Sequence, residues 1–546
     1  MVTLIVALGA CQPAVDVPGG GLPDTTPTET GIVPLDAPRL LRRMSIDLRG
    51  RLPEPAELDL VAADPAAIDG LRDEYLDDPA FAGQVVRMFG ERWLTLVDDF
   101  PIRTHDYGLD PSQEYAFERA VGEEPLRLLA DVAASDRPWT DVVTADYTMA
   151  DALLLTLWPL AAVDGEAGTG WVRARWTDDR PAVGVLASNG LWWRYPTSPL
   201  NYNRTRAAAT LRLLLCDDLL QRQVSLAGSA VGLDEEGAAE AVRSDPGCVG
   251  CHSVLDPLAT AYFGFWWYDQ YDPAELTRYH PEREPLGVRV LEREGALDGV
   301  PIDGLYALGE VIADDPRFAT CATATAAAAL WRRDTGLDDF QRLTQARAAF
   351  EQGGMRFKAL VRALTDGATY RAGGFAADAT DDARARERPT RLLTSEQLAD
   401  VYGALSGFVW DLDGFDLLRN DSAGFRTMAG GVDGVNVTRV QDVPGVTWTA
   451  VTRDVSVAVA IALVERDRAA GAGVFAGVDP DARPGSAAFD AALASVHWRL
   501  LATAPDAETL AEDAALWASL EALGGVDLAW AGVVAAILRD PLFLGY

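Results

Sequence analysis

Apolar residues recur along most of the chain at the three- and four-residue spacing that one face of an α-helix requires. This spacing predicts amphipathic helices at residues 57–63, 68–76, 82–97, 123–134, 205–224 and 319–328. Alternation with a period of two is rare, and the valine-rich segments 435–440 and 446–451 are the candidate strands. The pattern therefore predicts a mainly α-helical fold with few short strands.

Capping residues mark where two further helices begin. Asp36 stands ahead of the apolar pair Leu40 and Leu41, where its side chain can accept a hydrogen bond from a free backbone N–H. Thr394 and Gln397 have the spacing of a capping box, in which each side chain bonds the backbone of the other residue. We therefore expect ordered structure from about residue 36 and a new helix just after residue 394.

Changes in composition divide the 546 residues into regions, and a chain of this length is expected to hold three or four domains. Segments rich in Pro, Gly, Ala, Asp and Arg cannot bury a core and are assigned as tether or linker. The predicted regions are a lipoprotein signal segment (1–11), a disordered tether (12–34), an N-terminal helical domain (35–165), a domain around a cysteine motif (166–275), a following helical domain (276–375), a linker (376–389) and a C-terminal helical domain (390–546).

The net charge of −35 narrows the classes of partner. Nucleic acid and anionic lipid surfaces would repel such a chain, so we expect no nucleic-acid partner. A basic protein partner would be attracted, although a simple solvated acidic surface explains the charge equally well and is the more common case. The chain has no run of 18 or more apolar residues, and the sequence therefore predicts no transmembrane helix.

The N-terminus resembles a bacterial lipoprotein signal. A short apolar run over residues 2–8 leads into Leu8, Gly9, Ala10 and Cys11, the order of a lipobox, after which lipid would be attached to Cys11. The run is short and follows no Lys or Arg, which suggests a true start further upstream. The alternative is a frayed terminus with a chance cysteine. The lipobox predicts an exported protein of the bacterial cell envelope, anchored to a lipid bilayer, most simply the outer membrane.

The strongest chemical signal is Cys248, Cys251 and His252, which form the Cys-x-x-Cys-His motif of c-type haem attachment. Two thiols three positions apart share one helix face, from which each can reach one haem vinyl group. The histidine that follows is then the proximal iron ligand. With five cysteines and four histidines in the chain, a chance match is expected on the order of 0.0003 times. A disulfide, a zinc half-site or a redox dithiol are the alternatives.

Local signals around the motif agree with a helix. Asp245 can cap it, Pro246 fits its first turn, and Asp256 with Pro257 is expected to limit its length. The aromatic residues that follow could wall a haem pocket or could be ordinary core; they are Tyr262, Phe263, Phe265, Trp266, Trp267, Tyr268 and Tyr271. The candidates for a sixth iron ligand are His280, His105, Met149 and Met355, and the sequence does not choose among them.

Two cysteines remain after lipid and haem are assigned. Cys216 lies in the apolar helix predicted at 205–224, and Cys321 lies in the alanine-rich helix at 319–328. Exported proteins occupy an oxidising compartment, so a Cys216–Cys321 disulfide is predicted. The alternative is a pair of buried, reduced thiols that act as small hydrophobic residues.

Several segments together resemble the planctomycete-type cytochrome c multidomain proteins. The segments are Arg42–Gly50 with Leu52–Pro55, Asp78–Phe81 with Glu91–Leu94, Asp136–Pro138 with Thr144–Thr148, Arg180–Leu186 with Thr197–Pro199, Cys251–His252 with Asp256–Leu258 and Phe263–Phe265, Phe318–Cys321, and Phe357–Val361. The resemblance covers roughly residues 36–375, with a weaker likeness in 390–546. It implies a c-type cytochrome-like envelope protein with haem on Cys248, Cys251 and His252, and it implies no particular enzyme activity.

The sequence thus favours electron transfer by a lipoprotein with one covalent haem c. A haem-dependent, peroxidase-like enzyme with an open iron position is the second hypothesis. A non-redox envelope scaffold is the third, and a link to polysaccharide use is sometimes inferred for families of this kind. No carboxylate pair in the sequence supports polysaccharide hydrolysis independently.

Overall fold

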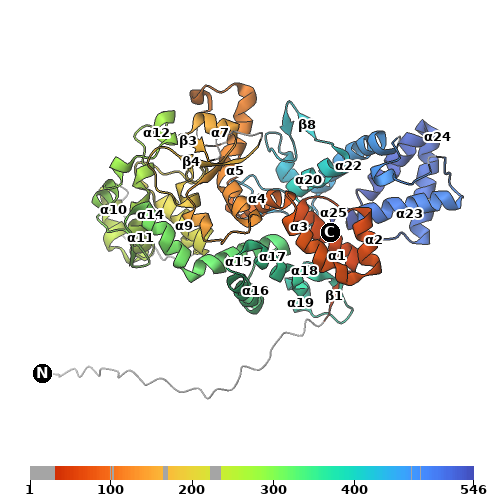
Figure 1. Ribbon diagram of the computed structural model, residues 1–546, viewed down its shortest axis with the longest axis horizontal. Helices are drawn as coiled ribbons and strands as arrows, with labels where there is room; N and C mark the ends of the chain where they lie inside the picture. Colours follow the sequence, from red (N-terminus) through yellow and green to blue (C-terminus); the bar gives the residue numbers. More distant parts are fainter. Residues whose placement is uncertain are drawn as a thin grey trace, which may run out of the picture.

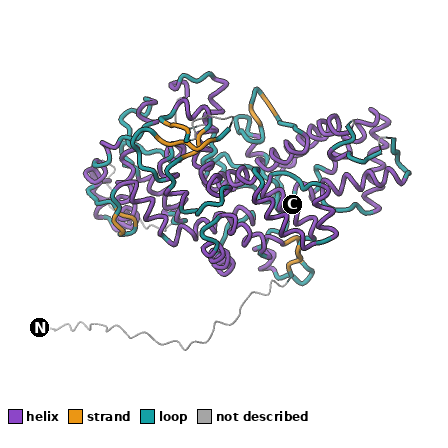
Figure 2. Tube along the Cα trace, viewed as in Figure 1, coloured by secondary structure: helices purple, strands orange, loops and turns teal. Residues whose placement is uncertain are grey.

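A computed structural model describes residues 31–98, 100, 104–163, 170–221, 235–468, 470–479 and 481–546. The described chain is 63% helix and 6% strand, which confirms the prediction of a mainly α-helical protein. Figure 2 shows how thinly the strands are distributed among the helices. The predicted signal segment, Cys11 and most of the predicted tether lie outside the described residues.

Helices build the first two thirds of the fold. They are α1 (Ala37–Arg49), α2 (Pro55–Ala63), α3 (Ile68–Asp77), α4 (Ala80–Trp93), α5 (Pro111–Ala134), α6 (Asp141–Thr144), α7 (Ala152–Leu157), α8 (Asn189–Arg194), α9 (Arg204–Leu215), α10 (Glu235–Ser244), α11 (Pro246–Ala259), α12 (Pro273–Thr277), α13 (Leu286–Leu291), α14 (Gly304–Asp314), α15 (Pro316–Trp331), α16 (Phe340–Gln352), α17 (Phe357–Asp366) and α18 (Ala368–Arg371). The cap at Asp36 is confirmed, because its carboxylate accepts a hydrogen bond from the backbone N–H of Arg39.

The remaining helices belong to the C-terminal part of the chain, of which α22, α23 and α24 lie on the right of Figure 1. They are α19 (Asp381–Arg386), α20 (Ser395–Ser406), α21 (Phe425–Met428), α22 (Val446–Leu463), α23 (Ala487–Leu501), α24 (Ala507–Ile537) and α25 (Pro541–Leu544). The predicted capping box at the start of α20 is present, with Thr394 and Gln397 bonding each other's backbone.

The strands are short and pair antiparallel. β2 (Thr148–Ala150), β4 (Val172–Trp176) and β3 (Leu160–Ala162) form a three-stranded sheet in that order. β5 (Ala296–Leu297) pairs with β6 (Val300–Pro301), and β8 (Asp411–Leu412) pairs with β9 (Phe415–Asp416). β1 (Ile32–Pro34) pairs with β7 (Ala372–Phe375), so the last three residues assigned to the tether form a strand.

Both predicted strands were wrong. Residues 446–451 are the first turns of α22, and residues 435–440 are irregular. The buried side chains of α22 include Trp448, Val451, Val455 and Val459, which recur every three to four residues. A six-residue window covers less than two helical turns, so it contains too little of that period to outweigh the strand preference of valine.

The predicted helix at 205–224 was too long. α9 ends at Leu215, and Cys216 takes a left-handed conformation with φ of 53°. Its backbone N–H bonds the carbonyl of Leu211, which closes the helix as a left-handed cap usually does. Cys216 therefore terminates the helix and does not lie near its middle. The predicted linker also differs from expectation, because residues 381–386 form α19.

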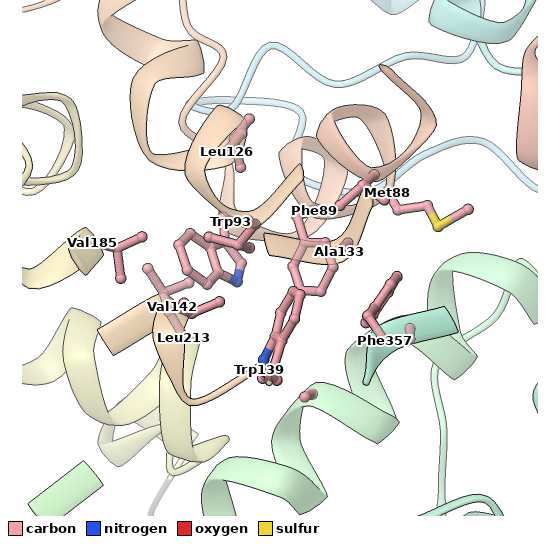
Figure 3. Close-up of a cluster of buried hydrophobic side chains, with 14 of the residues drawn as sticks. Met88, Phe89, Trp93, Leu126, Ala133, Trp139, Val142, Val185, Leu213 and Phe357 are labelled. Carbon is pink, nitrogen blue, oxygen red and sulfur yellow. The ribbon is translucent and has the colours of Figure 1, made fainter. Parts of the chain in front are cut away.

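Buried apolar side chains from residues 35 to 370 pack into one continuous core, shared by the three regions predicted between 35 and 375. Figure 3 shows its aromatic centre, where Trp139 stacks on Phe357 with ring centroids 4.8 Å apart and lies 5.3 Å from Phe89. Residues 392–546 build a second core of their own, to which Ile46 of α1 contributes. A smaller cluster packs under the β2–β4–β3 sheet.

A buried polar cluster on α1 joins these two cores. The guanidinium group of Arg43 is fully buried and donates to the backbone carbonyls of Tyr370, Ala372, Pro389 and Tyr546, at 2.6, 2.8, 2.7 and 3.0 Å. One turn further, Asp47 accepts from the hydroxyls of Tyr370 and Tyr546 at 2.9 and 2.6 Å. The segment Arg42–Gly50 thus acts as a structural connection between α1 and the last residue of the chain.

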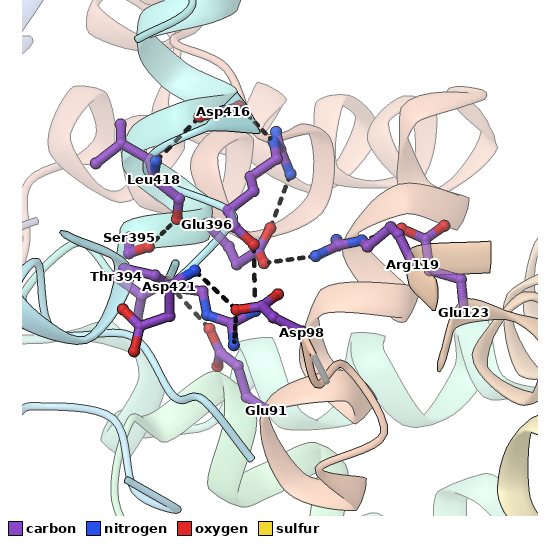
Figure 4. A network of polar contacts seen from close by, with 12 residues as sticks. Glu91, Asp98, Arg119, Glu123, Thr394, Ser395, Glu396, Asp416, Leu418 and Asp421 are labelled. Atoms are coloured by element: carbon purple, nitrogen blue, oxygen red, sulfur yellow. Dashed lines mark hydrogen bonds and ion pairs between the residues drawn. The ribbon is translucent and has the colours of Figure 1, made fainter. Parts of the chain in front are cut away.

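A second network joins α5 to the C-terminal part, as Figure 4 shows. Arg119 donates to Glu123 at 2.6 Å and to Glu396 of α20 at 3.2 Å, and Arg419 donates to Glu396 at 2.8 Å. Burial alone would raise the pKa of Glu396, but Arg119, Arg419 and Arg426 outweigh it and lower that pKa to about 2. The network therefore stays ionised at neutral pH. It lines a cleft of about 790 Å³ whose charged walls are held together by these pairs.

Two segments are long and apolar enough to span a membrane by length and composition, Val446–Arg468 and α24, although the sequence predicted none. Both contribute buried side chains to the second core. α24 also has a kink at Gly525, whose φ is 83°. The helical parts before and after the kink pack closely, since a Cβ added to Gly532 would lie 2.0 Å from Leu520. Core helices pass the same length and composition test, so these segments are weak evidence for a membrane span.

Candidate haem-attachment site

The Cys-x-x-Cys-His motif occupies the first two turns of α11, which lies beside α9 and α10 on the left of Figure 1. Asp245 caps the helix by accepting from the backbone N–H of Gly247 at 2.8 Å, and Pro246 takes the first position, as the sequence predicted. Pro257 limits the helix less than expected. It lies inside the helix, and α11 continues past it to end at Ala259.

Cys248 and Cys251 are both half-buried free thiols. Their three-residue spacing on a regular helix places them on one face, and His252 follows immediately with 23% of its side chain exposed. The structure therefore leaves two unpaired thiols and one imidazole partly accessible on the same two turns. This is the donor set that covalent attachment of one haem needs.

The His252 ring is held in place from one side. Its Nδ1 lies 3.0 Å from Oδ1 of Asp256, one helical turn further along α11. Arg204 of α9 clamps the same carboxylate, with Nε at 2.6 Å from Oδ1 and Nη2 at 3.0 Å from Oδ2. Burial alone would raise the pKa of Asp256, but its hydrogen bonds to His252 and Arg204 outweigh burial and lower it.

An ionised carboxylate can only accept hydrogen bonds, so Nδ1 of His252 must carry the proton that the contact needs. In the neutral imidazole, a proton on Nδ1 leaves Nε2 with a free lone pair, and this is the tautomer in which imidazole binds a metal ion. The residues present therefore fit a c-type haem. Sequence reasoning treated Asp256 only as part of a helix end, although its spacing of four residues from His252 was a readable sign of contact on one helix face.

The aromatic residues after the motif divide into two groups. Tyr262, Phe263 and Phe265 are buried in the main core, whereas Tyr268 and Tyr271 are exposed. Between them, Trp266 is half-buried and stacks on Phe263, Tyr202 and Trp267, with ring centroids 5.4, 6.0 and 6.4 Å apart. The buried group therefore belongs to the ordinary hydrophobic core, which was one of the two interpretations of the sequence. The half-buried stack around Trp266 is the aromatic cluster that reaches the protein surface.

The aromatic stack is connected to the histidine through charged residues. Arg204, which clamps Asp256, lies 5.6 Å above the ring of Tyr202, and Tyr202 stacks on Trp266. A continuous series of contacts therefore runs from His252 through Asp256 and Arg204 to the stacked rings.

The candidates for a sixth iron ligand have other contacts in the structure. His280 bonds the carbonyl of Glu275 through Nε2 at 3.1 Å, and its Nδ1 lies 3.5 Å from Glu282. His105 is largely exposed and pairs with its neighbour Asp106. Met149 is buried in β2, and Met355 packs against the main core in a turn. The structure brings none of these four into a described contact with His252.

A disulfide joins Cys216 to Cys321, the two cysteines left over by the sequence assignment. Their Cα atoms are 5.2 Å apart, within the range that a disulfide bridge requires. Cys216 ends α9, Cys321 lies in α15, and the bridge encloses the whole of α11. It therefore links the end of α9, the helix that begins with Arg204, to α15.

Replacing Cys216 and Cys321 by alanine is expected to lower the free energy of unfolding by about 2–5 kcal/mol, because the bridge closes a loop of 105 residues in the unfolded chain. Urea denaturation measures the change. Reducing agent should lower the midpoint of the unsubstituted protein and leave that of the variant unchanged. Equal midpoints for the oxidised and reduced unsubstituted protein would refute a stabilising bridge.

Comparisons with known proteins add no further identification. No protein-family model matches the chain, and neither a curated protein nor a solved structure was found that matches it. The resemblance to planctomycete-type cytochrome c proteins therefore stays a prediction that rests on the segments quoted from the sequence.

Proposed function

We propose that the chain is a c-type cytochrome-like protein with one covalent haem that transfers electrons in a bacterial cell envelope. The observation that carries the proposal is the donor set on α11. Two free thiols share a helix face, and the adjacent His252 is held by Asp256 in the tautomer that binds a metal. A disulfide elsewhere in the chain fits an oxidising compartment.

Attachment follows from the chemistry of the two thiols. Cys248 and Cys251 would each add sulfur to one carbon of a haem vinyl group and hydrogen to the other, so that a thioether would form and no group would leave. Electrons and atoms balance without an external oxidant. The spacing of the two cysteines on a helix places both sulfurs on one face. A loop would fix the positions of the two sulfurs less precisely.

A bound haem supplies an iron atom that exchanges one electron between its Fe(II) and Fe(III) states. His252 would offer Nε2 to that iron as the proximal ligand, and Asp256 would keep the imidazole ring oriented. The net charge of −35 favours a basic redox partner, which would dock faster at low ionic strength.

A peroxidase-like haem enzyme is the second candidate function, and one observation favours it. Asp256 offers His252 a carboxylate, and a carboxylate makes the imidazole a stronger donor to iron than a backbone carbonyl does. An open sixth position would then allow ligand chemistry. A non-redox scaffold with a structural haem, tied to polysaccharide use or to another envelope process, is the third candidate.

Optical spectra of the purified protein separate these functions. Electron transfer predicts reversible one-electron reduction and a six-coordinate spectrum that added cyanide or peroxide does not change. A spectrum that shifts on addition of either ligand would favour the enzyme. A haem that cannot be reduced and reoxidised reversibly would leave only the scaffold and would overturn electron transfer.

We also propose that lipid on Cys11 anchors the protein to the outer membrane. Cys11→Ser removes the sulfur that would carry the lipid, so the protein should move from the membrane fraction to the soluble fraction. Thr25→Ser is the matched control, since it introduces a serine into the neighbouring tether and keeps Cys11. Fractionation followed by immunoblotting measures the shift. A Cys11→Ser chain that remains in the membrane fraction would refute the anchor.

A further inference from the structure

We infer that Asp256 lowers the reduction potential of the haem iron by acting through His252, and that Arg204 limits this effect. The inference rests on the proposed function and deepens it, because it assigns control of the redox potential to two residues that bind neither haem nor iron. Asp256 and Arg204 are therefore positioning residues.

The geometry places Asp256 between a base and a cation. Its Oδ1 accepts from His252 at 3.0 Å and from Arg204 at 2.6 Å, and its Oδ2 accepts from Arg204 at 3.0 Å. Asp256 is only 5% exposed, so water and salt screen these contacts weakly. A hydrogen bond to a charged group in such surroundings is about twice as strong as a neutral one.

The carboxylate pulls the Nδ1 proton toward itself and leaves more electron density on the imidazole ring. A more electron-rich ligand stabilises Fe(III) relative to Fe(II), so the reduction potential falls. Arg204 works in the opposite direction. It holds both carboxylate oxygens and withdraws negative charge from them, which weakens the pull on the proton.

The two residues consequently predict shifts of opposite sign. Asp256→Asn replaces the charged acceptor by a neutral one and should raise the potential. We expect at least about a tenfold change in the Fe(III)/Fe(II) equilibrium, which corresponds to about 59 mV for one electron. Arg204→Gln keeps a donor toward Asp256 but removes the positive charge, and it should lower the potential.

The double variant separates action through the histidine from a simple charge effect. If Arg204 acts through Asp256, Arg204→Gln should shift the potential much less in the Asp256→Asn background than in the unsubstituted protein. Independent charge effects would instead add. Asp245→Asn is the matched control, because Asp245 lies on the same helix, asparagine also caps helices, and Asp245 makes no described contact with His252.

The experiment is spectroelectrochemical titration of the full-length, haem-loaded protein in the five forms. The inference requires a higher potential for Asp256→Asn, a lower one for Arg204→Gln, strong non-additivity in the double variant and a smaller shift for Asp245→Asn. Shifts of the same sign, additive shifts, or an equal shift for Asp245→Asn would overturn it.

Failure of the inference and failure of the proposed function give different results. A chain that carries no covalent haem overturns both. A chain that carries haem but whose potential does not respond overturns the inference alone. If Asp256→Asn does not retain haem, Arg204→Gln decides by itself, because it keeps the carboxylate and the imidazole; an unchanged or higher potential in that variant overturns the inference.

Discussion

Replacing Cys248 and Cys251 together by alanine is expected to abolish covalent haem, because both sulfurs that can form thioethers are then lost. Each single substitution should leave one thioether and a reduced but measurable amount of bound haem. Haem staining of denatured protein after acid-acetone extraction measures this, since extraction removes haem that is only coordinated. The graded series distinguishes two separate attachment points from a single one.

Val249→Ala is the matched control for these variants. Val249 lies between the two cysteines, is half-buried like them, and has no group that reacts with a vinyl carbon. This variant should keep full staining. If the double cysteine variant also kept full staining, haem attachment at α11 would be wrong, whatever else binds there.

Arg43→Met is expected to destabilise the protein by about 3–5 kcal/mol, the usual cost of removing one member from a buried, hydrogen-bonded charged cluster. Methionine fills much of the volume but leaves the carbonyls of Tyr370, Ala372, Pro389 and Tyr546 without their shared donor. It also leaves Asp47 with less positive charge around it. Urea denaturation, followed by tryptophan fluorescence, measures the effect.

Arg39→Met on the same helix is the control for Arg43→Met. Arg39 is half-exposed, and surface substitutions of this kind usually change stability by less than about 0.5 kcal/mol. A similar small effect at Arg43 would contradict the structural role of the cluster. Because Arg43 reaches the last residue of the chain, its loss should also make the C-terminal helices more sensitive to proteolysis.

Helix starts were predictable because their signals are local. Asp36 caps α1 and Thr394 caps α20 through bonds that span three residues, so sequence and structure agree there. Errors arose where tertiary packing or a single residue overrides the local pattern. α5 begins at Pro111, twelve residues before the predicted start at 123, and it continues through Pro125, a residue that normally disfavours a helix interior.

The contacts within the candidate haem site divide in the same way into local and long-range ones. Cys248, Cys251 and His252 are adjacent in the sequence, and their spacing alone indicates the chemistry. Asp256 could have been found from its four-residue spacing. Arg204 could not, because it lies 52 residues earlier and reaches Asp256 only through the packing of α9 on α11. The same holds for Arg43, whose partners lie more than 300 residues away.

The mass of the intact, denatured protein tests the central claim most directly. The full-length chain would be produced with a system that matures c-type cytochromes, reduced, and denatured before measurement. The account predicts a mass that exceeds by one haem that of the polypeptide as processed and lipidated at Cys11, with the haem mapped to the peptide that contains Cys248 and Cys251. The contradicting result would come from cells that mature a control cytochrome normally. In those cells, this chain would carry no added haem, and both Cys248 and Cys251 would remain alkylatable thiols.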